Sequence, residues 1–140
     1  MSKLGKDLLS TQLANARLSM ITVESPYSFD ETVKRLKEKM YGLGAEVLAE
    51  IDHSTNAKKV GMELEPTVVI YFGNPKVGTI LMQEVREIAY ELPLRVVVWT
   101  SSGKTYVGFR KPSEIGKEYG IKNNDILKKM DSLMENILNI

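Results

Sequence analysis

The residues with the clearest chemical potential lie in one loop, Phe72–Thr79, between an apolar segment and an amphipathic one. Gly73 accepts a positive φ, Pro75 forces Asn74 into an extended conformation, and Asn74 can cap a helix that begins at Pro75. Free backbone N–H groups at such a helix start, with Lys76 beside them, could hold a small anion or a carboxylate-bearing ligand. The same residues also suit a simple turn, and the spacing of a phosphate-binding P-loop is absent.

His53 is the only histidine, and its side chain alone has an unperturbed pKa near neutrality. It could act as a general acid or base beside a pocket. Adjacent strand residues point to opposite faces, so Asp52 orients His53 only if the chain has left the strand there. The alternative is a structural histidine at a strand end, because Asp52 and Ser54 are common helix-capping residues. Enzymatic activity therefore stays open.

Metal and cofactor chemistry is weakly supported. Zinc prefers cysteine and histidine ligands, and this chain has one histidine and no cysteine. Carboxylates such as Asp52, Glu63 or Glu65 would have to complete a site. A haem ligand at His53 has no supporting motif. We expect no metal and no cofactor.

A second polar group lies in an apolar segment further along the chain. Arg95 falls on the strand face opposite Leu94, which predicts a solvated face, an ion pair with Glu91, or a charge beside a pocket. Trp99 and Tyr106 flank a predicted hairpin and could pair across its strands.

Composition limits the class of protein. A chain of 140 residues fits one domain, and 43% hydrophobic with 26% charged residues is ordinary for a globular protein. The formal net charge of +1 gives no drive toward nucleic acid or an anionic membrane. The absence of cysteine excludes disulfides and fits a cytoplasmic protein. No apolar run has the length of a membrane span, and the N-terminus is too polar for a signal peptide.

The elements that must position these residues follow from periodicity and capping. In order, we expect a strand over 18–23, a helix over 28–42, a strand over 45–52, a short helix or loop over 53–61, a strand over 66–72, a helix over 75–92, strands over 93–99 and 104–109 joined by a turn at 101–103, a short helix over 112–120 and a final helix over 123–138. Ser28 and Glu31 form a capping box. Val47, Ala49 and Ile51 are expected on one face of their strand. The strand over 66–72 is apolar on both faces, which predicts a place in the middle of the sheet.

This order predicts an α+β fold with helices on one face of a curved, largely antiparallel sheet. Residues 1–16 are interpreted as an N-terminal appendage, 17–121 as a single α+β domain and 122–140 as an amphipathic C-terminal helix. The apolar stripe of that helix either covers its own sheet or packs against a second subunit.

Three segments together resemble the domain-of-unknown-function family numbered 302. They are Ile51-Asp52-His53 with Ala57, Pro66 to Gly78, and Glu91-Leu92-Pro93-Leu94-Arg95 through Trp99, continued by Gly103 to Phe109 and Pro112. The resemblance covers about residues 20–120. It implies a TATA-binding-protein-like α+β fold and a homodimer, with no established activity. The chain departs from the family at Thr100-Ser101-Ser102, where acidic residues are frequent, and at Phe109, where tyrosine is usual.

The function favoured by these observations is small-molecule binding by a homodimer, in a pocket near the loop. The expected ligand-binding residues are Phe72, Gly73, Asn74, Lys76, Thr79, Arg95 and Trp99. One alternative is an enzyme with His53 as the acid or base and Lys76 or Arg95 stabilising an anionic intermediate. The other is an adaptor that recruits a partner through the C-terminal helix.

Overall fold

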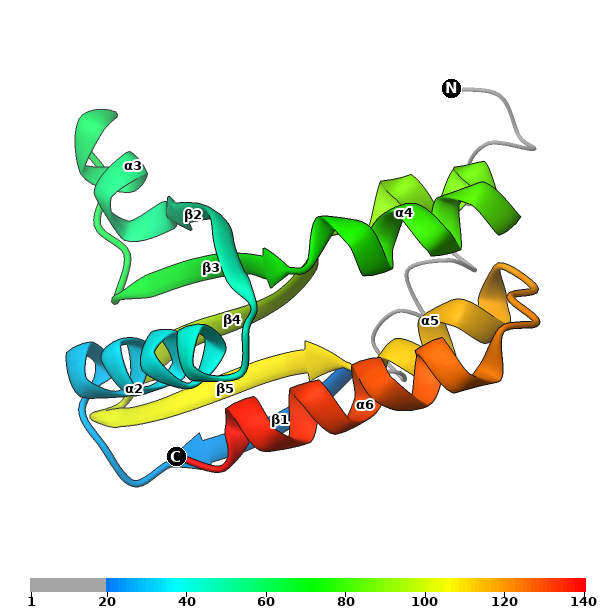
Figure 1. Cartoon of the computed structure of the whole chain (residues 1–140). Helices are drawn as coiled ribbons and strands as arrows, with labels where there is room; N and C mark the ends of the chain where they lie inside the picture. Colours follow the sequence, from blue (N-terminus) through cyan, green and yellow to red (C-terminus); the bar gives the residue numbers. More distant parts are fainter. Residues whose placement is uncertain (1–19) are drawn as a thin grey trace.

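A computed structural model describes residues 20–140 (Figure 1). The predicted appendage over 1–16 and the first residues of the predicted first strand lie outside the described part. The elements are β1 (Met20–Ser25), α2 (Phe29–Gly42), β2 (Glu46–Asp52), α3 (His53–Lys59), β3 (Thr67–Gly73), α4 (Pro75–Glu84), the 3₁₀ helix η1 (Arg86–Glu91), β4 (Leu94–Ser101), β5 (Lys104–Arg110), α5 (Pro112–Glu118) and α6 (Asn124–Leu138).

The strands form one five-stranded sheet in the order β1-β5-β4-β3-β2, and every neighbouring pair is antiparallel. The predicted α+β class is therefore confirmed. β3 is an interior strand, as its apolar faces predict, although β4 holds the centre of the sheet. On β3 the residues Val68, Ile70 and Phe72 are buried, and the residues between them are half-buried.

The edge strand β2 corrects one prediction. A register irregularity between Val47 and Ala49 places Val47 opposite Phe72 and Ala49 opposite Tyr71. Phe72 and Tyr71 are consecutive and point to opposite faces, so Val47 does not share a face with Ala49. A bulge of this kind inserts one residue and shifts the alternation. Strict two-residue spacing cannot reveal it.

The hydrophobic core lies between one face of the sheet and the helices α2 and α6, which pack side by side (Figure 1). Leu36 and Met40 reach it from α2. The stripe of α6 contributes its buried members Leu127, Met130, Met134 and Ile137. This stripe covers its own sheet, which is the first of the two arrangements that the sequence left open.

Local signals agree with the predicted ends of the elements. The Ser28 side chain accepts a hydrogen bond from the Glu31 N–H at 3.2 Å, which gives one half of the predicted capping box. The hairpin between β4 and β5 turns through Ser102 and Gly103, at φ values of 50° and 79°. Both central residues have positive φ, as a type I′ hairpin turn requires.

The helix predicted over 75–92 is interrupted, which corrects a second prediction. α4 ends at Glu84, Val85 is extended, and η1 continues as a 3₁₀ helix. The Glu84 carboxylate accepts hydrogen bonds from the N–H groups of Lys122 and Asn123 at 2.6 and 3.2 Å. The break lets Ile88 enter the core, where its side chain is 1% exposed. These contacts come from the segment before α6, so the local periodicity does not contain them.

Candidate functional site

The loop between β3 and α4 adopts the geometry that its residues predict. Gly73 has a φ of 155°, in the region that favours glycine. Asn74 is extended and caps α4, with its side-chain oxygen 2.9 Å from the Lys76 N–H. The next two N–H groups, of Val77 and Gly78, donate to the Asn74 carbonyl at 3.0 and 3.1 Å. The amides that were expected to hold an anion therefore already have partners within the loop.

A cavity of about 420 Å³ lies beside this loop. It is bounded by the turn before β2, the end of β3 with α4, the segment before β4, and α6. The described residues that line it are Leu43, Gly44, Ala45, Leu48, Phe72, Gly73, Asn74, Pro75, Val77, Gly78, Thr79, Met82, Ala89, Leu92, Pro93, Leu94, Lys129, Met130 and Leu133. Asn74, Thr79 and Lys129 are exposed and mark the mouth.

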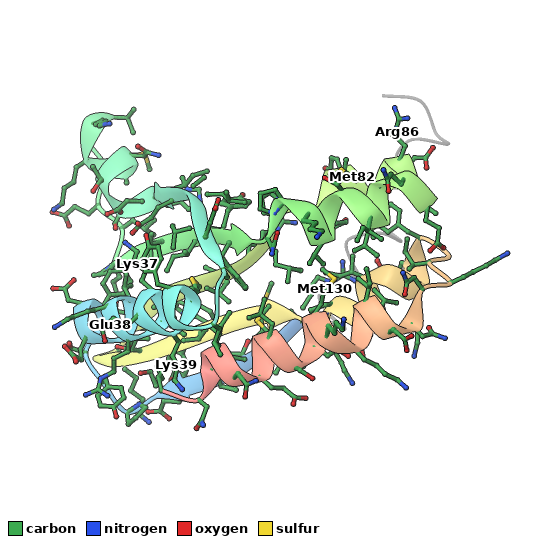
Figure 2. All side chains as sticks on the ribbon, viewed as in Figure 1. Lys37, Glu38, Lys39, Met82, Arg86 and Met130 are labelled. Carbon is green, nitrogen blue, oxygen red and sulfur yellow. The ribbon has the colours of Figure 1, made fainter. Side chains whose placement is uncertain are left out.

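Methionines from two helices form part of the wall. Met82 belongs to α4 and Met130 to α6, and both side chains are labelled in Figure 2. Methionine side chains are flexible and polarisable, so they adapt to ligands of irregular shape. The surface that a ligand would meet is apolar and deformable.

The structure brings four of the predicted ligand-binding residues to this cavity and leaves three outside its lining. Phe72, Gly73, Asn74 and Thr79 line it. Lys76 is exposed on the first turn of α4 and does not line the cavity. Thr79 donates its hydroxyl hydrogen to the Pro75 carbonyl at 2.7 Å, so it forms a hydrogen bond within α4 and also lines the cavity.

Arg95 and Trp99 lie on the sheet face opposite the core. Arg95 pairs with the Glu91 carboxylate at 3.6 Å and remains 47% exposed, so it combines two of the expected arrangements, the solvated face and the ion pair. The Trp99 ring stacks on Tyr106 across the hairpin, with ring centroids 5.6 Å apart. Arg95 is thus paired with η1, and Trp99 with the neighbouring strand β5.

A polar network holds η1 against α5. Glu91 accepts a hydrogen bond from the Tyr119 hydroxyl at 3.2 Å and lies 3.8 Å from Arg110, which also pairs with Glu118. Burial, and then the negative charge of Glu91, raise the pKa of the Tyr119 phenol above its ordinary value. These contacts fix the segment that carries Ala89 and Leu92 into the cavity wall.

His53 begins α3 at the far end of β3 from the cavity (Figure 1). Val68 pairs with Asp52 and Gly73 with Glu46, so five residues of strand separate the two ends, about 17 Å at the usual rise. The His53 side chain is exposed and forms no hydrogen bond with another described residue.

Asp52 serves the start of α3 and does not orient His53. Its carboxylate accepts hydrogen bonds from the Ser54 hydroxyl at 2.6 Å and from the Thr55 N–H at 2.9 Å. These two bonds, the Ser54 contact first, hold the pKa of Asp52 below its ordinary value. Asp52 is thus a helix cap.

The lining residues that sequence reasoning missed come from several elements: the turn before β2, β2, α4, the segment before β4, and α6. Met130 and Leu133 belong to the predicted apolar stripe of α6, which gave a signal for burial and none for a cavity. Lys129 gave no signal, because one exposed lysine on an amphipathic helix is unremarkable. Leu48 faces the cavity from the irregular part of β2.

Residues 20–140 contain neither a group of three metal-ligating side chains nor a helix that could span a membrane. No three of their histidine, aspartate or glutamate side chains are grouped to hold an ion. In the same part of the chain, no helix has both the length and the hydropathy to cross a bilayer.

Comparison with known proteins relates the chain to uncharacterised relatives and to longer proteins. It is 37% identical over 114 residues to "Fluoride-specific ion channel FluC 1" of Brucella suis biovar 1 (strain 1330), covering 79% of this chain and 45% of that protein. A protein of the same name from Brucella abortus biovar 1 (strain 9-941) has the same identity over 42% of its length. The chain thus spans less than half of these relatives.

A solved structure and a family model agree on the fold and the family. The structure is the "Crystal structure of uncharacterized conserved protein DUF302 from Bacillus stearothermophilus", with a TM-score of 0.71, 21% identity, and coverage of 86% of this chain and 93% of that one. At this identity the likeness shows the fold alone. The family model described as "Domain of unknown function DUF302" matches residues 21–137. The chain belongs to the DUF302 family.

Proposed function

We propose that this protein binds a small, predominantly apolar molecule in the cavity between α4, α6 and the start of β2. The observation that carries the proposal is the cavity itself. Its volume of about 420 Å³ falls within the roughly 300–1,000 Å³ typical of ligand sites. Its walls are mostly aliphatic side chains and methionines, with a few polar groups at the mouth. That combination suits a ligand held by apolar contact and oriented by a polar end.

The lining of this site supports binding over catalysis. Of the described residues that line the cavity, Lys129 is the only one with a titratable side chain. General acid–base catalysis needs positioned titratable groups, most often histidine, aspartate or glutamate. The alternative of an enzyme with His53 as acid or base has weaker support, because His53 lies at the opposite end of β3.

The adaptor alternative also has weaker support. It needs an apolar stripe free to meet a partner, and four side chains of the α6 stripe are buried in their own core. The homodimer implied by the family resemblance stays a prediction, which sedimentation velocity at several protein concentrations would test. The channel activity named for the Brucella proteins is no part of this proposal, since the chain matches less than half of each.

Methyl NMR on methionine-labelled protein tests the proposal with a neutral apolar probe such as naphthalene. The Met82 and Met130 methyl groups should shift saturably, because both side chains line the cavity. Met62, which is 64% exposed and distant in the fold, is the internal control and should not shift. Equal shifts at all three methyl groups, or none at Met82 and Met130, would refute the proposal.

A matched pair of variants at Gly78 makes the test specific. An added Cβ there would lie 3.7 Å from Leu92 Cδ1 and 3.8 Å from Met82 Cε, both atoms of the wall. Gly78→Leu should therefore project into the cavity and weaken probe binding. Gly78→Ala adds one methyl group and should retain it. Unchanged binding in Gly78→Leu would show that the probe binds elsewhere.

A further inference from the structure

The cavity has an uneven distribution of charge. Of the described residues that line it, Lys129 is the only charged one, and there is no acidic side chain among them. Lys129 is exposed on α6 and forms no ion pair with another described residue. An apolar chamber with one unpaired cation at its mouth is complementary to a ligand that has an apolar body and a single negative charge.

The hydrogen-bonding capacity of the mouth points the same way. Asn74 uses its side-chain oxygen to accept from the Lys76 N–H, so its amide nitrogen presents two donor hydrogens away from that contact. The Lys129 ammonium group carries three donors and no acceptor. Both side chains line the cavity. The Asn74 amide nitrogen and the Lys129 ammonium group are therefore free donors at the mouth, and they match a headgroup made of acceptor oxygens.

The helix start itself does not supply this recognition. The N–H groups of Lys76, Val77 and Gly78 are all bonded to Asn74. An anion at the mouth must therefore be held by side chains, and the charge must come from α6, which lies opposite the loop that the sequence singled out.

We infer that the natural ligand class is an amphipathic monocarboxylate, such as a medium-chain fatty acid, with its chain in the cavity and its carboxylate at Lys129. This inference rests on the proposed function, because it names the ligand class of the same cavity. Binding requires no covalent step. The apolar chain provides most of the affinity, and Lys129 determines the preference for an acid over a neutral molecule.

A matched pair of ligands and a matched pair of variants test the inference by methyl NMR titration. Decanoate and decanol share a chain and differ in the headgroup; decanoate is titrated below its micelle-forming range and decanol below its solubility limit. Decanoate should bind the wild-type protein more tightly than decanol. Lys129→Gln should weaken decanoate binding about tenfold, which corresponds to the loss of one charge-assisted contact of roughly 1.4 kcal/mol, and should leave decanol unchanged.

Lys128→Gln is the control, because Lys128 is exposed on the same helix and does not line the cavity. It should leave both affinities unchanged. If decanol binds and decanoate shows no advantage, or if Lys129→Gln weakens both ligands equally, the inference fails while the proposed function stands. If neither ligand nor naphthalene moves the Met82 and Met130 signals, the proposed function fails as well.

Discussion

Two glycines in the middle of helices should respond in opposite directions to the same one-methyl change. Gly78 is in α4 and Gly116 is in α5. Replacing an interior helical glycine by alanine gains about 0.5–1 kcal/mol from backbone entropy. What differs is the space around the new methyl group, and the structure defines that space at both positions.

At Gly78 the added Cβ would have its nearest atoms at 3.7 and 3.8 Å, which is ordinary contact. The propensity gain should be retained, so Gly78→Ala should stabilise the protein by about 0.5–1 kcal/mol. At Gly116 the added Cβ would lie 2.5 Å from Leu127 Cδ2 and 2.7 Å from Leu127 Cδ1. Leu127 is 3% exposed and has little room to move. Overpacking costs about 1–3 kcal/mol, so Gly116→Ala should destabilise by about 1–2 kcal/mol after the propensity gain.

Urea unfolding followed by Trp99 fluorescence measures both changes, because the chain has one tryptophan. The midpoint should rise for Gly78→Ala and fall for Gly116→Ala, with an unchanged m-value. Adding Leu127→Ala to Gly116→Ala tests the cause, because removing the leucine removes the clash and the two effects should not add. A Gly116→Ala protein as stable as the wild type, or additive effects in the double variant, would refute the packing of α5 against α6.

Three further changes test other contacts. Asp52→Ala should cost about 1 kcal/mol by removing the cap of α3, as measured by urea unfolding at pH 7. The pKa of Asp52 in the folded protein lies below its unfolded value of roughly 3.9. The stabilisation is therefore complete above about pH 4, and the difference in stability from wild type should shrink as pH falls through the lower folded pKa. Ile137→Ala should cost about 2–5 kcal/mol, because the side chain is fully buried, and the loss should not vary with protein concentration; a concentration-dependent loss would place this part of α6 in an intersubunit contact. Thr32→Val should cost about 1 kcal/mol by removing the 2.6 Å hydroxyl contact with Ser25, and an equally stable variant in urea unfolding would contradict that contact.

Sequence reasoning succeeded where one residue determines its neighbours. Ser28 and Asn74 cap the helices that follow them, and each bond closes within three residues. The turn at Ser102 and Gly103 is local in the same sense. Helix caps and turns of this kind depend on the side-chain chemistry and backbone preferences of a few neighbouring residues, so they can be predicted without knowledge of the rest of the fold.

The predictions that failed depend on distant contacts. The interruption of the helix at Val85 accompanies hydrogen bonds from Glu84 to the backbone of residues 122 and 123. The irregularity in β2 depends on its pairing with β3. Neither partner is near in sequence, so hydrophobic periodicity alone predicts a continuous helix and a regular strand.

The loop between β3 and α4 was predicted as a site because of its backbone N–H groups, but what the structure places beside it is an apolar cavity. The sequence points to residues 72–79 because a strand that enters a helix exposes N–H groups. The capping residue that makes this entry possible, Asn74, also uses those groups. A well-capped helix start is therefore poorly suited to binding an anion through its backbone, since capping and anion binding compete for the same donors. Any anion preference of this cavity must come from side chains. The charged side chain among the described lining residues is Lys129, which lies in α6, 50 residues beyond Thr79.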